Sequence, residues 1–163
     1  MFFLLHRRNL KICIPILMEN KGKIYSFDLY EHKINLIKES ANRLSVDIID
    51  AKVRDALSKD VPLPACDKLI CDVPCSGFGI IRRKPEIRYK KATIIDNLPQ
   101  LQYSVLCANA DMLECGGILV YSTCTFNIEE NERTVYEFAK NYGYEVLPLP
   151  KKVQDKVACG VQY

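Results

Sequence analysis

The chain has 163 residues, of which 48% are apolar and 26% are charged. This length predicts one domain that can bury a core, and the ordinary apolar content without low-complexity blocks excludes a disordered chain. The net charge of +3, from 23 basic and 20 acidic side chains, is too small to identify a partner, so any charge signal must come from clustering.

The N-terminus and the cysteines indicate the compartment. The chain begins Met-Phe-Phe-Leu-Leu and then turns basic, which is the reverse of the order in a signal peptide. No apolar run approaches the roughly 20 residues that span a bilayer. The eight cysteines include no CxxC pair and form no regular framework. We therefore expect a cytoplasmic protein with reduced thiols, no membrane partner and no bound metal, and we expect it to be a monomer.

The first half of the chain predicts strands that alternate with a helix. Residues 23–29 follow an Asn-Lys-Gly turn signal and form a β-branched and aromatic run, which is typical of a strand. Residues 31–44 place apolar side chains at helical spacing. Residues 47–53 and 68–73 are predicted as the next two strands.

The second half continues the alternation. A long helix is predicted over residues 96–113, ended by Gly116 and Gly117, and a strand follows at 118–122. Asn127 and Glu130 have the spacing of a capping box that opens the next helix, and Gly143 suits its left-handed C-cap. Residues 144–147 are predicted as a fifth strand. This alternation is typical of βαβ units and an open parallel sheet.

Polar residues follow four of the predicted strands, where ligands bind in such sheets. They are Asp28, Asp55, the run from Asp72 to Cys75, and the run from Ser122 to Thr125. Each could be a turn or capping residue on its own, but their joint occurrence favours one functional edge.

Residues 72–91 (DVPCSGFGIIRRKPEIRYKK) carry the strongest local signal. Glycines there allow close approach of the backbone to a ligand. Basic side chains cluster in the second half of the segment and surround Tyr89, which predicts contact with a polyanion such as RNA. The predicted RNA-binding residues are Arg82, Arg83, Lys84, Arg88, Lys90 and Lys91.

Two segments resemble known motifs. Residues 72–89 resemble motif IV of the Sun/RsmB-type ribosomal RNA cytosine-5 methyltransferases, and YSTCTFNIEENE at 121–132 resembles motif VI of that family. The resemblance extends over about residues 17–149. It implies a Rossmann-like class I methyltransferase core, an α/β fold with a mainly parallel sheet, that uses S-adenosylmethionine as the cofactor.

The resemblance also implies roles for individual residues. Cys124 in motif VI would be the nucleophile that adds to C6 of cytosine, and Cys75 in motif IV would assist the release step. Asp72 would hydrogen-bond the polar edge of an unstacked cytosine and would also lie in the cofactor site. Asp28 resembles the motif II acid that binds the ribose hydroxyls, and Asp55 resembles the residue that contacts the adenine. The remaining cysteines match no motif and are expected to be structural, and a zinc site formed by Cys66, Cys71 and Cys75 is disfavoured by their irregular spacing.

Parts of the family pattern are missing. The family has a glycine-rich motif I after its first strand, but this chain has no glycine before Gly22, and His6 to Asn9 stand in the expected loop region. We therefore predict that residues 1–17 are a divergent or aberrant segment, from a truncated or frameshifted gene. Residues 18–163 are then a partial catalytic domain that lacks the C-terminal strands and the normal first strand, which is either absent or replaced by residues 2–5.

The implied function is methyl transfer to C5 of a cytosine in ribosomal RNA of the small-subunit (16S-like) type, through a covalent cysteine adduct. The missing glycine loop predicts weak cofactor binding. Two alternatives stay open at this point: a catalytically inactive RNA-binding fragment, and a cofactor-binding regulatory module without an RNA partner.

Overall fold

The computed structural model describes residues 2–5, 10–59 and 63–149. The chain forms two compact units, which are described separately. The first unit comprises the described residues of 1–73 and 105–122, and the second comprises those of 74–104 and 123–163. In the described part of the chain, no helix is long and apolar enough to cross a membrane.

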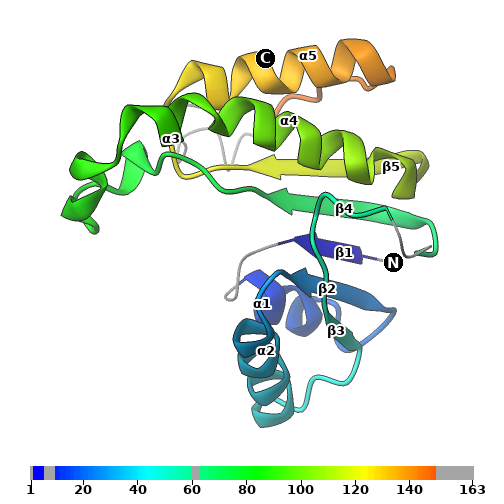
Figure 1. Cartoon of the computed structure of the whole chain (residues 1–163). Helices are drawn as coiled ribbons and strands as arrows, with labels where there is room; N and C mark the ends of the chain where they lie inside the picture. Colours follow the sequence, from blue (N-terminus) through cyan, green and yellow to red (C-terminus); the bar gives the residue numbers. More distant parts are fainter. Residues whose placement is uncertain (1, 6–9, 60–62, 150–163) are drawn as a thin grey trace. The chain divides into compact units, whose positions relative to one another are not determined.

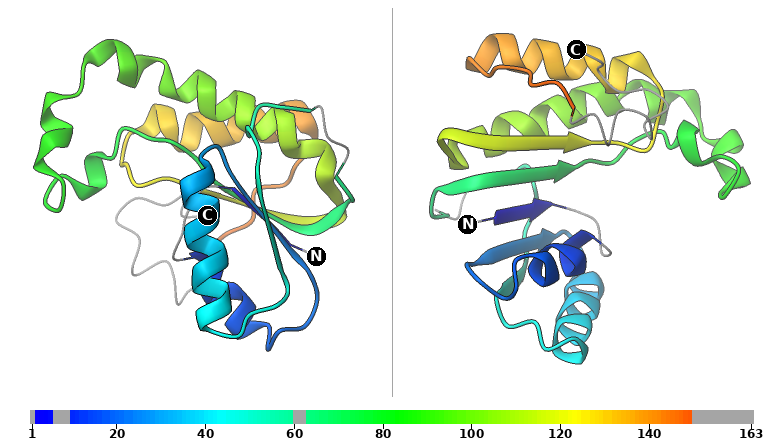
Figure 2. Two further views of the ribbon diagram at one scale, coloured as in Figure 1. Left: turned by 60° about the horizontal axis from the view of Figure 1, so that its bottom comes forward. Right: turned by 180° about the vertical axis from the view of Figure 1, so that it is seen from behind.

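The first unit contains a five-stranded sheet with the order β3-β2-β1-β4-β5, and every neighbouring pair is parallel (Figures 1 and 2). Its strands are β1 (Phe2–Leu5), β2 (Ile24–Asp28), β3 (Ile49–Val53), β4 (Cys66–Asp72) and β5 (Leu113–Ser122). This is the strand order of the Rossmann fold, in which the chain starts at the centre of the sheet and winds outward in both directions. The expected α/β class and parallel sheet are therefore confirmed.

The predicted absence of the first strand is wrong. Phe2–Leu5 form β1, which pairs with β2 on one side and with β4 on the other. Four apolar residues are enough here, because a central strand is hydrogen-bonded on both edges. Helix α1 (Leu10–Leu17) follows, so the chain has both the strand and the helix that flank motif I in the family pattern. Residues 6–9, which join them, lie outside the described residues.

Helix α2 (Glu31–Arg43) covers β2 and β3 beside α1 (Figure 1). Its helical spacing places Ile34 and Ile37 on one face, where both are buried against Ala51 of β3. A neighbouring apolar cluster joins Ala41 of α2 to Ile24 of β2. This packing holds the carboxyl ends of the two strands in fixed positions.

The long helix predicted over residues 96–113 forms, but it begins at Leu98, its last turn is a 3-10 helix, and a separate short helix precedes it. The chain forms α3 (Ala92–Asp96), α4 (Leu98–Asn109) and the short 3-10 helix η3 (Ala110–Met112). Pro99 has no backbone N–H to continue a helix from α3, and the Asn97 side chain donates to the Thr93 carbonyl at 2.9 Å. Helix α4 begins in the second unit and ends in the first.

Gly116 and Gly117 are predicted to end the helix, but this is wrong, because both lie inside β5. They belong to an irregularity in the pairing, because Cys66 pairs with Leu113 and Lys68 with Ile118. Gly116 has a φ of +79°, which glycine adopts without strain. Regular pairing covers Ile118–Ser122, as predicted.

The described part of the second unit contains α3, the 3-10 helices η1 (Phe78–Ile80), η2 (Pro85–Tyr89) and η4 (Ile128–Glu130), and α5 (Glu132–Tyr142). Gly143 caps α5 with a φ of +70°, as predicted. Phe138 is buried and stacks on Tyr142, with ring centroids 4.9 Å apart. No strand forms at residues 144–147, so that prediction is wrong.

Candidate active site

In the first unit, the register of the sheet aligns two acids on either side of β1. Leu5, the last residue of β1, pairs with Phe27 and with Cys71. Asp28 and Asp72 each follow one of those partners, so they lie at the same level of the carboxyl edge. The separation of neighbouring strands places the two backbones about 10 Å apart. A ligand that lies across the end of β1 would meet an acid on each side.

Asp28 is fixed by local contacts. Its Oδ1 accepts a hydrogen bond from the Tyr30 N–H at 3.2 Å and lies 3.6 Å from the Lys33 ammonium. Its carbonyl accepts from the Arg54 N–H at 3.0 Å, which ties the end of β2 to the segment after β3. These contacts hold the carboxylate in one orientation at the carboxyl edge of the sheet.

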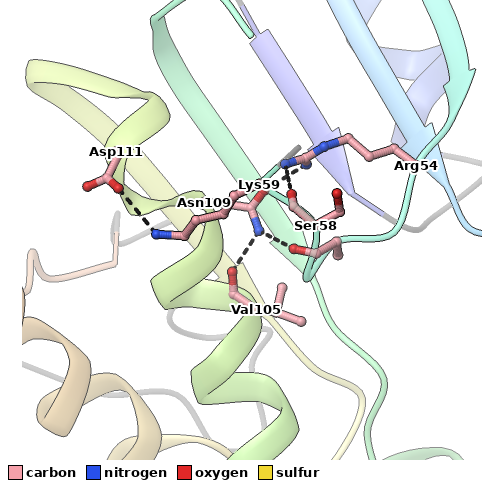
Figure 3. Close-up of polar contacts among 7 residues, drawn as sticks. Arg54, Ser58, Lys59, Val105, Asn109 and Asp111 are labelled. Atoms are coloured by element: carbon pink, nitrogen blue, oxygen red, sulfur yellow. Dashed lines mark hydrogen bonds and ion pairs between the residues drawn. The ribbon is translucent and has the colours of Figure 1, made fainter. Parts of the chain in front are cut away.

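Asp55 lies two residues after β3, in a loop that Arg54 and Asn109 hold in place (Figure 3). The Arg54 guanidinium donates to Asn109 Oδ1 at 2.9 Å and to the Ser58 carbonyl at 2.6 Å. Asn109 is completely buried and donates from Nδ2 to the Ala56 carbonyl at 2.8 Å and to the Val105 carbonyl at 2.7 Å. Burial lowers the pKa of Arg54.

Two further contacts define this loop. Asp55 Oδ1 accepts from the Leu57 N–H at 2.9 Å, which closes a turn next to Arg54. Lys59 and Asp111 form an ion pair at 3.4 Å with both side chains exposed (Figure 3). Such an exposed pair adds little stability, so the buried Arg54–Asn109 contact is the principal anchor of the loop.

Asp72 ends β4 and is buried. Its Oδ1 accepts a hydrogen bond from the Ser122 hydroxyl at 3.0 Å, at the end of β5. The Val73 N–H donates to the Ser122 carbonyl at 3.2 Å. The ends of β4 and β5 are thus joined, and the chain continues from them to Cys75 and Cys124.

In the second unit, Cys75 and Cys124 form a close pair of half-buried thiols. Their Sγ atoms are 2.9 Å apart, and the Cys124 N–H donates to Cys75 Sγ at 3.2 Å. Burial, followed by the hydrogen bond with Cys124, raises the pKa of Cys75 from 9.0 to about 11. Cys75 is therefore a neutral thiol near neutral pH and can donate its proton to the Cys124 sulfur.

Gly79 allows the two segments to approach. Its N–H donates to the Cys124 carbonyl at 3.0 Å, and an added Cβ would lie 3.0 Å from that same oxygen. A larger residue would push the Cys124 segment away. The close approach that the glycines of residues 72–91 predict is thus made to the chain's own backbone.

The other cysteines lie elsewhere. Cys66 and Cys71 are buried in β4, where burial raises their pKa values to about 11 and about 12. Cys107 is half-buried and Cys115 is exposed. Nothing is described of the Cys13 side chain, and Cys159 lies outside the described residues.

Glu130 belongs to this site, although the sequence pattern predicted only a helix-capping role for it. Its carboxylate is fully buried and accepts from the Ser76 N–H at 2.8 Å, from Gln102 Nε2 at 3.0 Å and from Asn127 Nδ2 at 3.0 Å. The predicted capping box is only half formed, because Asn127 caps η4 by accepting from the Glu129 N–H while its own N–H donates to Thr125 Oγ1. The Asn-x-x-Glu spacing predicted a local capping role for Glu130 and carried no signal for its contacts with Ser76 and Gln102.

The basic segment, residues 82–91, contains η2, in which the side chain of Ile87 is buried. All six cations are exposed, and Arg82, Arg83, Lys84, Arg88 and Lys91 form no ion pair with another described residue. Lys90 differs, because its ammonium donates to the carbonyls of Ser76 at 2.7 Å and Cys75 at 3.3 Å. Lys90 thus contacts the backbone of Cys75 and of the residue that follows it.

A Rossmann-type sheet with acids at its carboxyl edge defines a nucleotide- or cofactor-binding α/β protein. Comparison with known proteins identifies the family. Residues 12–163 match the family described as 16S rRNA methyltransferase RsmB/F, and the chain belongs to that family.

Curated relatives support this assignment. The chain is 42% identical over 149 residues to a probable ribosomal RNA small subunit methyltransferase B of Bacillus subtilis (strain 168), covering 88% of this chain and 33% of the relative. It is 36% identical over 133 residues to a protein of the same description from Synechocystis sp., covering 79% of this chain and 30% of that protein. The chain therefore spans about a third of the length of these relatives.

Solved structures agree in fold. The crystal structure of NSun6 from Pyrococcus horikoshii with SFG matches with a TM-score of 0.78 and 27% identity, covering 86% of this chain and 37% of that one. A methyltransferase homologue from Pyrococcus horikoshii matches with a TM-score of 0.78 and 30% identity, covering 91% and 47%. The Rossmann-like methyltransferase fold that the resemblance implies is confirmed.

Proposed function

We propose that this chain carries the catalytic core of a ribosomal RNA cytosine-5 methyltransferase that uses S-adenosylmethionine and forms a covalent cysteine adduct with its substrate. The proposal rests on one observation above all: two thiols from distant parts of the chain, Cys75 and Cys124, meet with their sulfur atoms 2.9 Å apart. We still propose that residues 1–17 are divergent in sequence, but they supply β1 and α1 of the core and are not a segment separate from residues 18–163.

The paired thiols suit attack on an electron-poor ring. C5 of cytosine is a weak nucleophile until a thiolate adds to C6, after which C5 can attack a methyl group. Cys124 would add to C6. Cys75, kept protonated by its raised pKa, would donate a hydrogen bond to the Cys124 thiolate before attack. Once Cys124 is bonded to C6 it no longer accepts that hydrogen bond. After methyl transfer a base would take the proton from C5, the C6–S bond would break and Cys124 would leave as the thiolate, and Cys75 would assist this release step.

The first unit suits the cofactor. When bound, S-adenosylmethionine supplies an electrophilic methyl group. Asp28 and Asp72 flank the end of β1 at one level of the sheet, where an elongated cofactor would lie. Asp28 would accept from the ribose hydroxyls, and Asp55 would contact the adenine from the loop that Arg54 anchors. Asp72 would serve the cofactor site and the polar edge of the cytosine.

The second unit suits single-stranded RNA. The exposed cations of the basic segment surround Tyr89, which is 87% exposed. Phe126, two residues after Cys124, is 55% exposed and lies against Phe78, with ring centroids 5.9 Å apart. Exposed aromatic rings beside basic residues are suited to stacking on unpaired bases, and an unstacked cytosine is what the chemistry requires.

Covalent trapping tests the proposal. RNA that contains 5-azacytosine, incubated with the chain and S-adenosylmethionine, is expected to form a covalent adduct that survives denaturing electrophoresis. Cys124→Ala should abolish the adduct, whereas replacing the exposed Cys115 by Ala should leave it unchanged. Salt-sensitive RNA binding without any adduct would contradict catalysis and would favour the inactive RNA-binding fragment.

A further inference from the structure

The buried carboxylate of Glu130 contacts the backbone next to Cys75 rather than the thiol itself. Glu130 lies at the end of η4, six residues after Cys124. The Ser76 N–H that it accepts, at 2.8 Å, belongs to the residue directly after Cys75. A hydrogen bond from a backbone N–H to an ionised carboxylate is about twice as strong as one between neutral groups.

Gln102 extends the contact to the other side of Cys75. Its Nε2 donates to Glu130 Oε2 at 3.0 Å and to the Pro74 carbonyl at 2.8 Å. The residues before and after Cys75 are therefore both held by one carboxylate–amide pair. Glu130, Gln102 and Ser76 are each fully buried, so these hydrogen bonds do not compete with water.

A third contact joins the residues that follow the two thiols. Ser76 Oγ and Thr125 Oγ1 are 2.7 Å apart, and both residues are buried. Contacts around Glu130 thus fix the chain on both sides of Cys75 and directly after Cys124. Burying a carboxylate costs a large desolvation free energy. The hydrogen bonds that offset this cost connect Glu130 to the backbone on both sides of Cys75.

We propose that Glu130 is a positioning residue for the thiol pair: through the Ser76 amide and Gln102 it sets the separation of the Cys75 and Cys124 sulfur atoms. This inference rests on the proposed function for its catalytic meaning. The positioning role itself concerns only the free protein, and it is testable without RNA or cofactor.

The test measures the alkylation of each thiol by iodoacetamide between pH 7 and pH 10, followed by peptide mass spectrometry. In Glu130→Leu, no side-chain oxygen remains to accept from the Ser76 N–H and from Gln102 Nε2, which both donate to Glu130 Oε2, so the Cys75 segment moves away from Cys124. Cys75 then loses burial and its thiol partner, and its pKa falls from about 11 toward 9.0. The thiolate fraction near pH 8 should rise by about 10- to 100-fold, and alkylation of Cys75 with it.

Thr134→Val is the matched control. Thr134 is buried in the same unit and donates to the Glu129 carbonyl at 2.7 Å, so its loss removes a comparable hydrogen bond that leads to neither thiol. This variant should leave the pH profile of Cys75 unchanged. A merely structural role for Glu130 predicts similar profiles for both variants.

An unchanged Cys75 profile in a folded Glu130→Leu variant would overturn the proposal. If that variant does not fold, Gln102→Ala decides, because it leaves the Ser76–Glu130 hydrogen bond in place. It should raise Cys75 alkylation by a smaller factor, and no rise would refute the role. Azacytosine trapping of the wild-type chain is scored separately, so absence of an adduct counts against the proposed function alone.

Discussion

The Asn109 amide offers the sharpest test of how the loop that carries Asp55 is held. Asn109→Ala removes the acceptor of the Arg54 guanidinium and two donations, to the carbonyls of Ala56 and Val105, from a completely buried position. A hydrogen bond to a charged group contributes about 1.5–3 kcal/mol, and a neutral one about 1 kcal/mol. The higher helix propensity of alanine returns roughly 0.5 kcal/mol. We therefore expect the free energy of unfolding to fall by about 3 kcal/mol.

The measurement is equilibrium unfolding in urea, followed by far-ultraviolet circular dichroism. Asn141→Ala is the matched control, because the exposed Asn141 amide donates only to the Tyr103 hydroxyl among the contacts described, and its loss should cost less than about 0.5 kcal/mol. A loss below about 1 kcal/mol for Asn109→Ala would refute the reasoning, since it would mean that Arg54 finds another partner at no cost.

Two further predictions concern the second unit. Arg83→Ala, in the basic segment, should weaken RNA binding and reduce the slope of log K against log salt concentration by about 0.7. Arg43→Ala on α2 is the control and should change neither the affinity nor the slope. Equal slopes for the two variants would show that Arg83 does not contact RNA. Diamide should oxidise Cys75 and Cys124 to an intramolecular disulfide, because their sulfur atoms are already 2.9 Å apart. The intact mass should fall by two hydrogen masses, and neither Cys75 nor Cys124 should then be alkylated. Dimers cross-linked through the exposed Cys115, with Cys75 and Cys124 still free, would contradict this expectation.

The parts of the site that the sequence predicted are those governed by local pattern. Asp28 and Asp72 end strands because each follows a short apolar run, and parallel strands bring such ends to one edge. The pairing of Cys75 with Cys124 could not follow from spacing, since 49 positions separate them. The strand pattern predicted only that the segments of both cysteines lie at one edge of the sheet, and the resemblance of the two motifs predicted that both thiols act there.

The errors have physical causes too. The first strand was missed because residues 1–17 depart from the family pattern, although strand formation depends on pairing with neighbouring strands, and Phe2–Leu5 pair with both β2 and β4. The helix break at Asn97 was visible in the sequence, since Pro99 cannot donate a backbone hydrogen bond. Glu130 was read as a capping residue because its tertiary partners, Ser76 and Gln102, are remote in sequence.

The central position of β1 has a consequence for the integrity of the sheet. Strands β2 and β4 do not pair with each other, so the four residues Phe2–Leu5 supply the hydrogen bonds that join the β2–β3 half to the β4–β5 half. Without them the sheet would separate into two ladders of two strands each, a size that is at best marginally stable in water. The alignment of Asp28 with Asp72 thus depends on the four residues of β1, because the strands that carry these two acids are each hydrogen-bonded to β1 and not to each other.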